Sequence, residues 1–167
     1  MNETYFKVNM FSYIRLIEIV LPKMVQQNRG IVINVSSQTA LAPVPLMTTY
    51  AATKAFITFL SEGLSVEYES KGVTIQTVMP SMTKTKLLHG SHRSSFFAVT
   101  PEDFVSSAIN TVGIETLTFG HWKHKLLVYI IEWFTYVCGN RFTANLALKV
   151  LKQSRDEYYM RINSKIE

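Results

Sequence analysis

The chain has 167 residues, of which 47% are hydrophobic and 17% charged, and its formal net charge is +5. This length suits one domain with a buried core, and this composition excludes a disordered or tail-like chain. The single cysteine excludes an internal disulfide framework. No Gly-rich or aromatic-interleaved basic motif accompanies the positive charge, so we expect no nucleic-acid partner.

The first half of the chain alternates between helical and strand-like patterns. Residues 10–27 have the apolar spacing of a helix, and the β-branched run 31–36 predicts a short strand buried on both faces. A second helix follows, and residues 73–80 predict a second buried strand. Together these elements predict a βαβ unit with parallel strands. The apolar stripe expected to pack the second helix consists of Ala52, Ala55, Phe56, Phe59, Leu60, Gly63 and Leu64.

The second half begins with an irregular basic stretch after Pro80. Its basic residues form either a solvated loop or a patch for a phosphorylated substrate: Lys84, Lys86 and Arg93. Residues 100–113 predict a helix with Thr100 as its N-cap. The aromatic run 123–138 predicts a helix that either packs in the core or lies in a membrane interface. A last helix is expected from residue 141 onward, and no stretch requires a membrane-spanning helix.

A tyrosine and a lysine, Tyr50 and Lys54, lie one turn apart on the second helix. That helix follows the end of the first strand, where Ser37 lies. Ligands bind at the carboxyl ends of strands in open parallel sheets, so we expect Ser37 and Tyr50 to meet there. An ammonium nearby favours the phenolate, and we therefore expect Lys54 to lower the pKa of Tyr50. The neighbouring Ser36 is expected to be structural.

The pattern S-x12-Y-x3-K resembles that of the short-chain dehydrogenase/reductase superfamily. Asn9 and the run "LPKMVQQNRGIVINVSS" extend the resemblance, and "VMPSMTKTK" resembles the family's P-G-x-x-x-T segment with Ser81 in the glycine position. The segments "LAPVPLMTTYAATKAF", "VEYESKGV" and "SSAINTVG" resemble one branch. That branch contains the 17-beta-hydroxysteroid dehydrogenases and the very-long-chain 3-oxoacyl-CoA reductases of the endoplasmic reticulum.

The resemblance implies an α/β fold, the C-terminal part of a doubly wound Rossmann-like parallel sheet. Residues 1–120 would form the catalytic part of this domain, and residues 121–167 a helical C-terminal extension that contacts a membrane. The family's Gly-rich phosphate-binding loop and first four strands have no counterpart in the sequence. The chain is then either a fragment of a longer reductase or a truncated gene product, and the strand at 31–36 becomes an exposed edge. We expect the chain alone to bind no NADPH measurably.

The resemblance also implies a role for each matching residue. Tyr50 would donate a proton to the carbonyl oxygen, and Ser37 would orient the carbonyl. Lys54 would bind the nicotinamide ribose, and Asn9 would hold a water that relays protons to Lys54. The residues expected to contact the cofactor are Tyr50, Lys54, Pro80, Thr83 and Thr85.

The function implied is NADPH-dependent reduction of a 3-oxoacyl-CoA or a 17-ketosteroid at the endoplasmic reticulum membrane. The nucleotide phosphates of an acyl-CoA would suit the basic stretch after Pro80. The alternative is a non-catalytic, membrane-associated interaction protein that pairs with relatives or with itself through helices 10–27 and 48–71. The histidine pairs 89/92 and 121/124 have metal-like spacing, but no carboxylate or cysteine cluster accompanies them and no metal is expected.

Overall fold

The structure, a computed structural model, describes residues 2–86 and 94–163. The helices are α1 (Asn2–Phe6), α2 (Ser12–Gln26), α3 (Thr48–Glu69), α4 (Pro101–Ile109), α5 (Trp122–Cys138) and α6 (Asn140–Asn163). Two short helical segments of other geometry are a π-helix, η1 (Lys7–Phe11), and a 3-10 helix, η2 (Gln38–Leu41). The strands are β1 (Gly30–Val35), β2 (Val73–Val78) and β3 (Leu117–Thr118).

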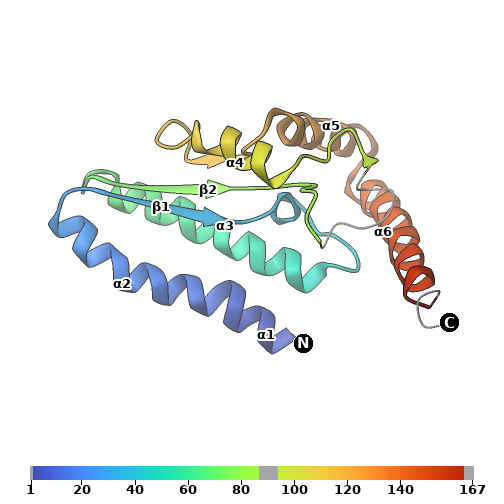
Figure 1. The fold of residues 1–167 in the computed structure, drawn as a ribbon, viewed down its shortest axis with the longest axis horizontal. Coiled ribbons are helices and arrows are strands. Elements are labelled where there is room, and N and C mark those ends of the chain that lie inside the picture. The colour runs from blue at the N-terminus through green and yellow to red at the C-terminus, as the bar shows by residue number, and fades with distance from the viewer. Residues whose placement is uncertain (1, 87–93, 164–167) are drawn as a thin grey trace.

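The three strands form one parallel sheet in the order β1-β2-β3. Helices α2 and α3 run along one side of β1 and β2, whereas α4 lies on the other side, and α6 extends away from the sheet (Figure 1). The parallel pairing of β1 with β2 across α3 confirms the predicted βαβ unit. The α/β fold class with a helical C-terminal part is likewise confirmed.

The main core lies between α2, α3 and the sheet. Its buried members are Ile17 and Leu21 from α2 and Val73 and Ile75 from β2, and side chains of β1 and α3 pack around them. The helical spacing predicted for residues 10–27 is therefore confirmed. Removal of these side chains from water is the largest favourable term that holds the layers together.

Strand β1 differs from the prediction that it is buried on both faces. Asn34 is buried, but Ile31, Ile33 and Val35 are 54%, 45% and 46% exposed. Helices α2 and α3 pack on one face of β1, and among the described residues β1 pairs with β2 alone. The prediction of an exposed apolar edge is confirmed, and the prediction of two buried faces is wrong.

Only part of the apolar stripe predicted for α3 packs in the core, where Leu60 and Leu64 lie against the buried cluster. Phe59 is 75% exposed, and no atom lies within 4 Å of a Cβ built on Gly63. The buried residues of α3 are instead Ala51, Thr53, Lys54, Ile57, Thr58 and Ser61. The prediction was wrong for the rest of the stripe because these polar side chains have partners that the sequence pattern does not reveal. Asn34 Nδ2, for example, donates to Ser61 Oγ over 2.8 Å.

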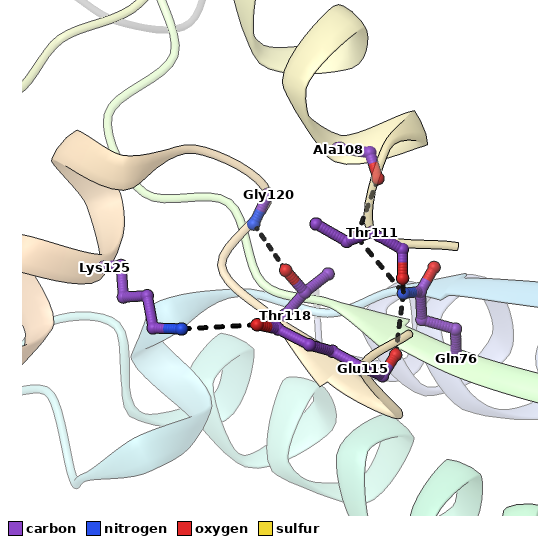
Figure 2. A network of polar contacts seen from close by, with 7 residues as sticks. All are labelled: Gln76, Ala108, Thr111, Glu115, Thr118, Gly120 and Lys125. Carbon is purple, nitrogen blue, oxygen red and sulfur yellow. Dashed lines mark hydrogen bonds and ion pairs between the residues drawn. The ribbon is translucent and has the colours of Figure 1, made fainter. Parts of the chain in front are cut away.

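A buried glutamine joins the sheet to the α4–α5 region. Gln76 is 0% exposed, and its Nε2 donates to the carbonyl oxygens of Thr111 and Glu115, each over 2.8 Å. The Glu115 side chain in turn forms an ion pair with Lys125 of α5 at 3.3 Å (Figure 2). The two hydrogen bonds of Gln76 and this partly exposed ion pair thus fix the turn after α4 against β2 and α5.

Replacement of this glutamine tests its contribution to stability. We expect Gln76→Leu to lower the free energy of unfolding by about 1–3 kcal/mol, because two part-buried carbonyl oxygens lose their donor. Chemical denaturation measures the change. The matched control is Gln153→Leu on the exposed surface of α6, where the glutamine bonds to Glu157 and the expected change is within about 0.5 kcal/mol. Equal losses in the two variants would contradict this role of Gln76.

Candidate functional site

Two adjacent serines follow β1, and they have different partners. Ser36 is 2% exposed, and its hydroxyl donates to the Lys54 carbonyl over 2.8 Å and lies 2.9 Å from Thr58 Oγ1. Its backbone N–H donates to the Val78 carbonyl of β2 over 2.8 Å. The predicted structural role of Ser36 is therefore confirmed, since it fastens α3 to the carboxyl end of the sheet.

Ser37 points to the first turn of α3. Its hydroxyl caps η2 by accepting the Thr39 N–H over 3.2 Å. It also lies near the Tyr50 phenol, because a side-chain interaction with Ser37 is one of the causes that set the pKa of Tyr50. The two hydroxyl groups that sequence spacing brings to one point therefore do meet. A carbonyl placed beside them would have two hydroxyl donors for its oxygen.

The pKa of Tyr50 lies above its ordinary value. Burial of the phenol raises this pKa most, the hydrogen bond from Ser37 lowers it, and the nearby Tyr5 raises it. The rings of Tyr5 and Tyr50 meet edge to face with centroids 6.2 Å apart. The prediction that Lys54 lowers this pKa is wrong for this structure, because burial dominates and Lys54 is directed elsewhere.

The ammonium group of Lys54 is held at the edge of β1. Its Nζ donates to the Val35 carbonyl over 2.9 Å and lies 5.8 Å from the centroid of the Tyr50 ring. Burial lowers the pKa of Lys54, whose side chain belongs to the buried face of α3. Lys54 is thus near Tyr50, but its charge is directed to the backbone.

A third tyrosine, Tyr13, completes this cluster, and sequence analysis missed it. The Tyr13 hydroxyl also donates to the Val35 carbonyl, over 3.0 Å, and its ring centroid is 5.9 Å from Lys54 Nζ. Burial raises the pKa of Tyr13, and so does the nearby Tyr50. Its position four residues after Asn9 on the same helical run was the available signal.

Asn9 lies in the π-helix η1, a feature that the apolar pattern could not reveal. Its Nδ2 donates to Thr53 Oγ1 over 3.1 Å, and Thr53 Oγ1 donates to the Tyr50 carbonyl over 2.8 Å. Asn9 therefore contacts α3 directly, between Tyr50 and Lys54. Single π-turns occur frequently at functional sites. The water-binding role of Asn9 remains a prediction.

The segment after β2 lies beside the segment after β1. The Pro80 carbonyl accepts the Gln38 N–H over 3.1 Å, and Thr83 forms a parallel bridge with Val99. Four side-chain atoms on these two segments are buried without a hydrogen-bond partner among the described residues: Gln38 Oε1, Thr39 Oγ1, Ser81 Oγ and Thr83 Oγ1. Buried polar atoms need partners, so these segments fit a polar ligand such as the nicotinamide carboxamide. Thr85 is exposed at the far end of the segment.

The described part of the chain contains no group of three His, Cys, Asp or Glu side chains that could hold a metal ion. His89 and His92 lie outside the described residues. The ring centroids of His121 and His124 are 6.0 Å apart, and the His124 nitrogens contact backbone groups of Ser81 and Met82.

Comparison with curated proteins finds several reductases of one kind. The chain is 42% identical over 125 residues to the very-long-chain 3-oxoacyl-CoA reductase of Homo sapiens. The aligned residues are 75% of this chain and 40% of that protein. It is 36% identical over 151 residues to the reductase of the same name from Anas platyrhynchos. There the aligned residues are 90% of this chain and 47% of the relative. The chain thus spans about half the length of the curated relatives it matches.

Solved structures and a family model give a consistent result. A 7beta-hydroxysteroid dehydrogenase structure is 29% identical with a TM-score of 0.66, over 74% of this chain and 51% of that one. A short-chain dehydrogenase from Sphingobium yanoikuyae in complex with NADPH is 29% identical with a TM-score of 0.63, over 70% and 47%. The family model described as short chain dehydrogenase matches residues 2–94. The chain belongs to the short chain dehydrogenase family.

Proposed function

We propose that this chain carries the catalytic part of an NADPH-dependent oxidoreductase that reduces the 3-oxo group of a long-chain acyl-CoA. The single observation that carries the proposal is the approach of the Ser37 and Tyr50 side chains, with Lys54 and Asn9 beside them. The similarity to very-long-chain 3-oxoacyl-CoA reductases supports the substrate class. A 17-ketosteroid is the second substrate class, supported by the resemblance to the 17-beta-hydroxysteroid dehydrogenases.

In this proposal the two hydroxyls act on the substrate carbonyl. Ser37 donates to the carbonyl oxygen and holds it beside Tyr50, and Tyr50 donates the proton that converts the oxygen into a hydroxyl. The raised pKa of Tyr50 keeps the phenol protonated at neutral pH, as a proton donor requires. In the reverse direction, the Ser37 hydrogen bond stabilises the phenolate that accepts the proton.

Lys54, Asn9 and the segment after β2 would serve the cofactor side of the site. NADPH, when bound, supplies the hydride. Lys54 would leave the Val35 carbonyl to donate to ribose hydroxyls, and Asn9 would hold the proton-relaying water near it. Pro80, Thr83 and Thr85 would contact the nicotinamide end, and the unpartnered Thr83 hydroxyl supports this placement.

The basic residues after β2 favour an acyl-CoA over a steroid. Lys84 lies within the cofactor-contact segment and Lys86 directly after it. Lys86 is exposed, and Arg93 lies outside the described residues. The positive charge of these lysines, next to the cofactor-contact segment, would attract the phosphates of the nucleotide part of an acyl-CoA. A steroid offers no such charge.

Membrane contact at the endoplasmic reticulum is part of the proposal. No helix in the described ranges is both long and apolar enough to cross a bilayer. Large exposed side chains nevertheless gather on α5 and the start of α6, and we assign them to an interface-lying segment within the extension 121–167. They are Trp122, Leu126, Tyr129, Ile130, Ile131, Trp133, Tyr136, Val137 and Phe142. Trp and Tyr favour the headgroup level of a bilayer.

The second candidate function is a non-catalytic protein that pairs with itself or with a relative. The exposed apolar side chains of α2 and α3 favour it, including Ile19 at 72%, Phe59 at 75% and Val66 at 76% exposure. A groove between the two helices, lined by Ile14, Leu21 and Leu64 among others, adds apolar surface. Such a surface would suit pairing through these helices.

A chimaera tests the catalytic proposal. In it, this chain replaces the matching segment of the human very-long-chain 3-oxoacyl-CoA reductase. We expect NADPH oxidation with a long-chain 3-oxoacyl-CoA and a fall in kcat of about 10²–10⁴-fold in Tyr50→Phe, since the proton donor is removed. Tyr68→Phe, on the same helix, is the matched control and should retain activity.

The same assay separates the alternatives. Faster turnover with a 17-ketosteroid would assign the second substrate class. An unchanged rate in Tyr50→Phe would contradict the assigned proton donor. A chimaera that binds NADPH but turns over neither substrate would favour the non-catalytic candidate.

Vesicle co-sedimentation of the 167-residue chain tests the membrane contact. We expect binding to vesicles of phosphatidylcholine and phosphatidylserine, and severalfold weaker binding in Trp133→Ala, because Trp133 is 66% exposed on α5. Phe59→Ala is the control, since it removes an exposed aromatic ring from α3 instead. Equal loss in both variants, or no binding by the chain, would contradict an interface role for α5.

A further inference from the structure

His124, on the first turn of α5, is a fully buried histidine whose two ring nitrogens both contact the segment after β2. It is 0% exposed. The Ser81 N–H donates to His124 Nδ1 over 3.3 Å, and His124 Nε2 lies 3.3 Å from the Met82 carbonyl oxygen. None of the roles assigned above to substrate or cofactor contacts uses this side chain.

The hydrogen-bond pattern fixes the protonation state of His124. A backbone N–H can only donate, so Nδ1 must accept and carries no proton. The carbonyl oxygen of Met82 can only accept, so Nε2 must carry the proton. The two contacts together therefore require the neutral imidazole with its proton on Nε2. An imidazolium ion has a donor at each nitrogen and could not accept from Ser81.

The peptide group held by His124 is also bound to the segment that carries Ser37. The Ser81 N–H and the Pro80 carbonyl belong to one planar peptide group. Its carbonyl accepts the N–H of Gln38, the residue after Ser37, over 3.1 Å. This peptide group is thus held at one end by α5 and at the other by the start of η2.

The rest of the surroundings keep His124 in place. Phe104 of α4 packs against the imidazole with ring centroids 5.4 Å apart. The Phe104 ring also lies close to Gly120: a Cβ added to this glycine would be 2.6 Å from ring atoms of Phe104. The Met82 carbonyl, besides its contact with Nε2, accepts the Val99 N–H over 3.0 Å. His124 is therefore built into a packed junction of α4, α5 and the segment after β2.

We propose that His124 is a positioning residue which, in its neutral form, fixes the Pro80–Ser81 peptide group and through it the relative placement of Ser37 and the segment after β2. Its consequence for cofactor binding rests on the proposed function, which assigns Pro80 and Thr83 to the nicotinamide end. The positioning itself does not depend on that function.

The electrostatic surroundings agree with a neutral imidazole. Burial lowers the pKa of His124 most; the Met82 carbonyl raises it, His121 lowers it, and the Phe119 carbonyl raises it, with a lowered pKa as the result. His121 is thus the titratable side chain that acts on the pKa of His124. Burial and then Lys123 lower the pKa of His121, and Asp103 of α4 raises it.

The sign of the pH dependence follows from this lowered pKa. The neutral form is favoured in the folded chain, so the stabilisation is complete above the ordinary histidine value of about 6.5. It is lost as the pH falls through the lower pKa of the folded state. Acid should therefore release the Pro80–Ser81 peptide group.

Amide hydrogen exchange of the 167-residue chain, followed by NMR at Ser81 and Gln38, tests the proposal. In His124→Leu, which keeps apolar volume but loses both contacts, we expect exchange at Ser81 to be about tenfold faster, the factor that corresponds to one hydrogen bond. His124→Gln offers an acceptor and a donor and should retain the protection. After correction for intrinsic exchange, protection in the unaltered chain should fall in acid, whereas His124→Gln should keep it.

Two references separate positioning from general stability. The first is the Met79 N–H, which donates to the Thr118 carbonyl over 2.8 Å and reports the stability of the sheet. The second is His121→Asn, which removes the neighbouring imidazole but retains an N-cap acceptor for α5. Protection at Ser81 that is unchanged in His124→Leu, or an equal acid response in His124→Gln, would overturn the proposal. So would exchange at Met79 that accelerates as much as that at Ser81.

The consequence for the cofactor is measured in the chimaera. His124→Leu should raise the KM for NADPH severalfold with a smaller change in kcat, and His124→Gln should restore it. An inactive chimaera with the expected exchange at Ser81 would count against the proposed function and leave the positioning role intact. A normal KM together with rapid exchange at Ser81 would overturn the link to the cofactor.

Discussion

The rotation of α3 about its own axis is the constraint on which the whole site depends. Three buried polar contacts set it: Ser36 with the Lys54 carbonyl, Ser36 with Thr58, and Asn34 with Ser61. Apolar surfaces can slide past one another, but buried hydrogen bonds have one geometry, and an unpaired group in this interface would cost stability. With this rotation fixed, Tyr50 faces Ser37, and Lys54 faces the edge of β1.

The two adjacent serines have different roles, one structural and one in the proposed site. Backbone alternation at the end of an extended strand sends Ser36 and Ser37 in different directions. Ser36 holds the helix, and Ser37 meets the phenol that the helix carries. Asn9 adds a third connection, because its contact with Thr53 joins the π-helix η1 to the same turn of α3. The site is thus assembled by contacts between three elements at one end of the sheet.

Much of this arrangement could be predicted from the sequence. The spacing of Ser37, Tyr50 and Lys54 depends on local geometry, namely a strand end and one helical turn. The helical spacing of apolar residues identified α2, and short buried-looking runs identified the parallel strands. The packing face of α3 could not be predicted in this way. Ser61, Thr58 and Lys54 look like surface residues until their buried partners are known, and Phe59 looks like a core residue until it is found exposed.

The direction of the Tyr50 pKa shift could not be predicted from the sequence either. A lysine one turn from a tyrosine suggests a lowered phenol pKa, yet Lys54 donates to the Val35 carbonyl, a group that an edge strand leaves available. Burial then determines the direction for both side chains: it raises the pKa of Tyr50 and lowers that of Lys54. Short spacing fixes which residues are neighbours, whereas the direction of a flexible side chain depends on the backbone groups within its reach.

The most direct test concerns the bond between the Ser37 and Tyr50 hydroxyls. A double-mutant cycle with Ser37→Ala, Tyr50→Phe and the combined variant measures their coupling in the free energy of unfolding of this chain. We expect a coupling of about 0.5–1.5 kcal/mol, the net contribution of one hydrogen bond. Strictly additive losses would mean that the two hydroxyls do not interact, and the account of a shared proton-donating site would be contradicted.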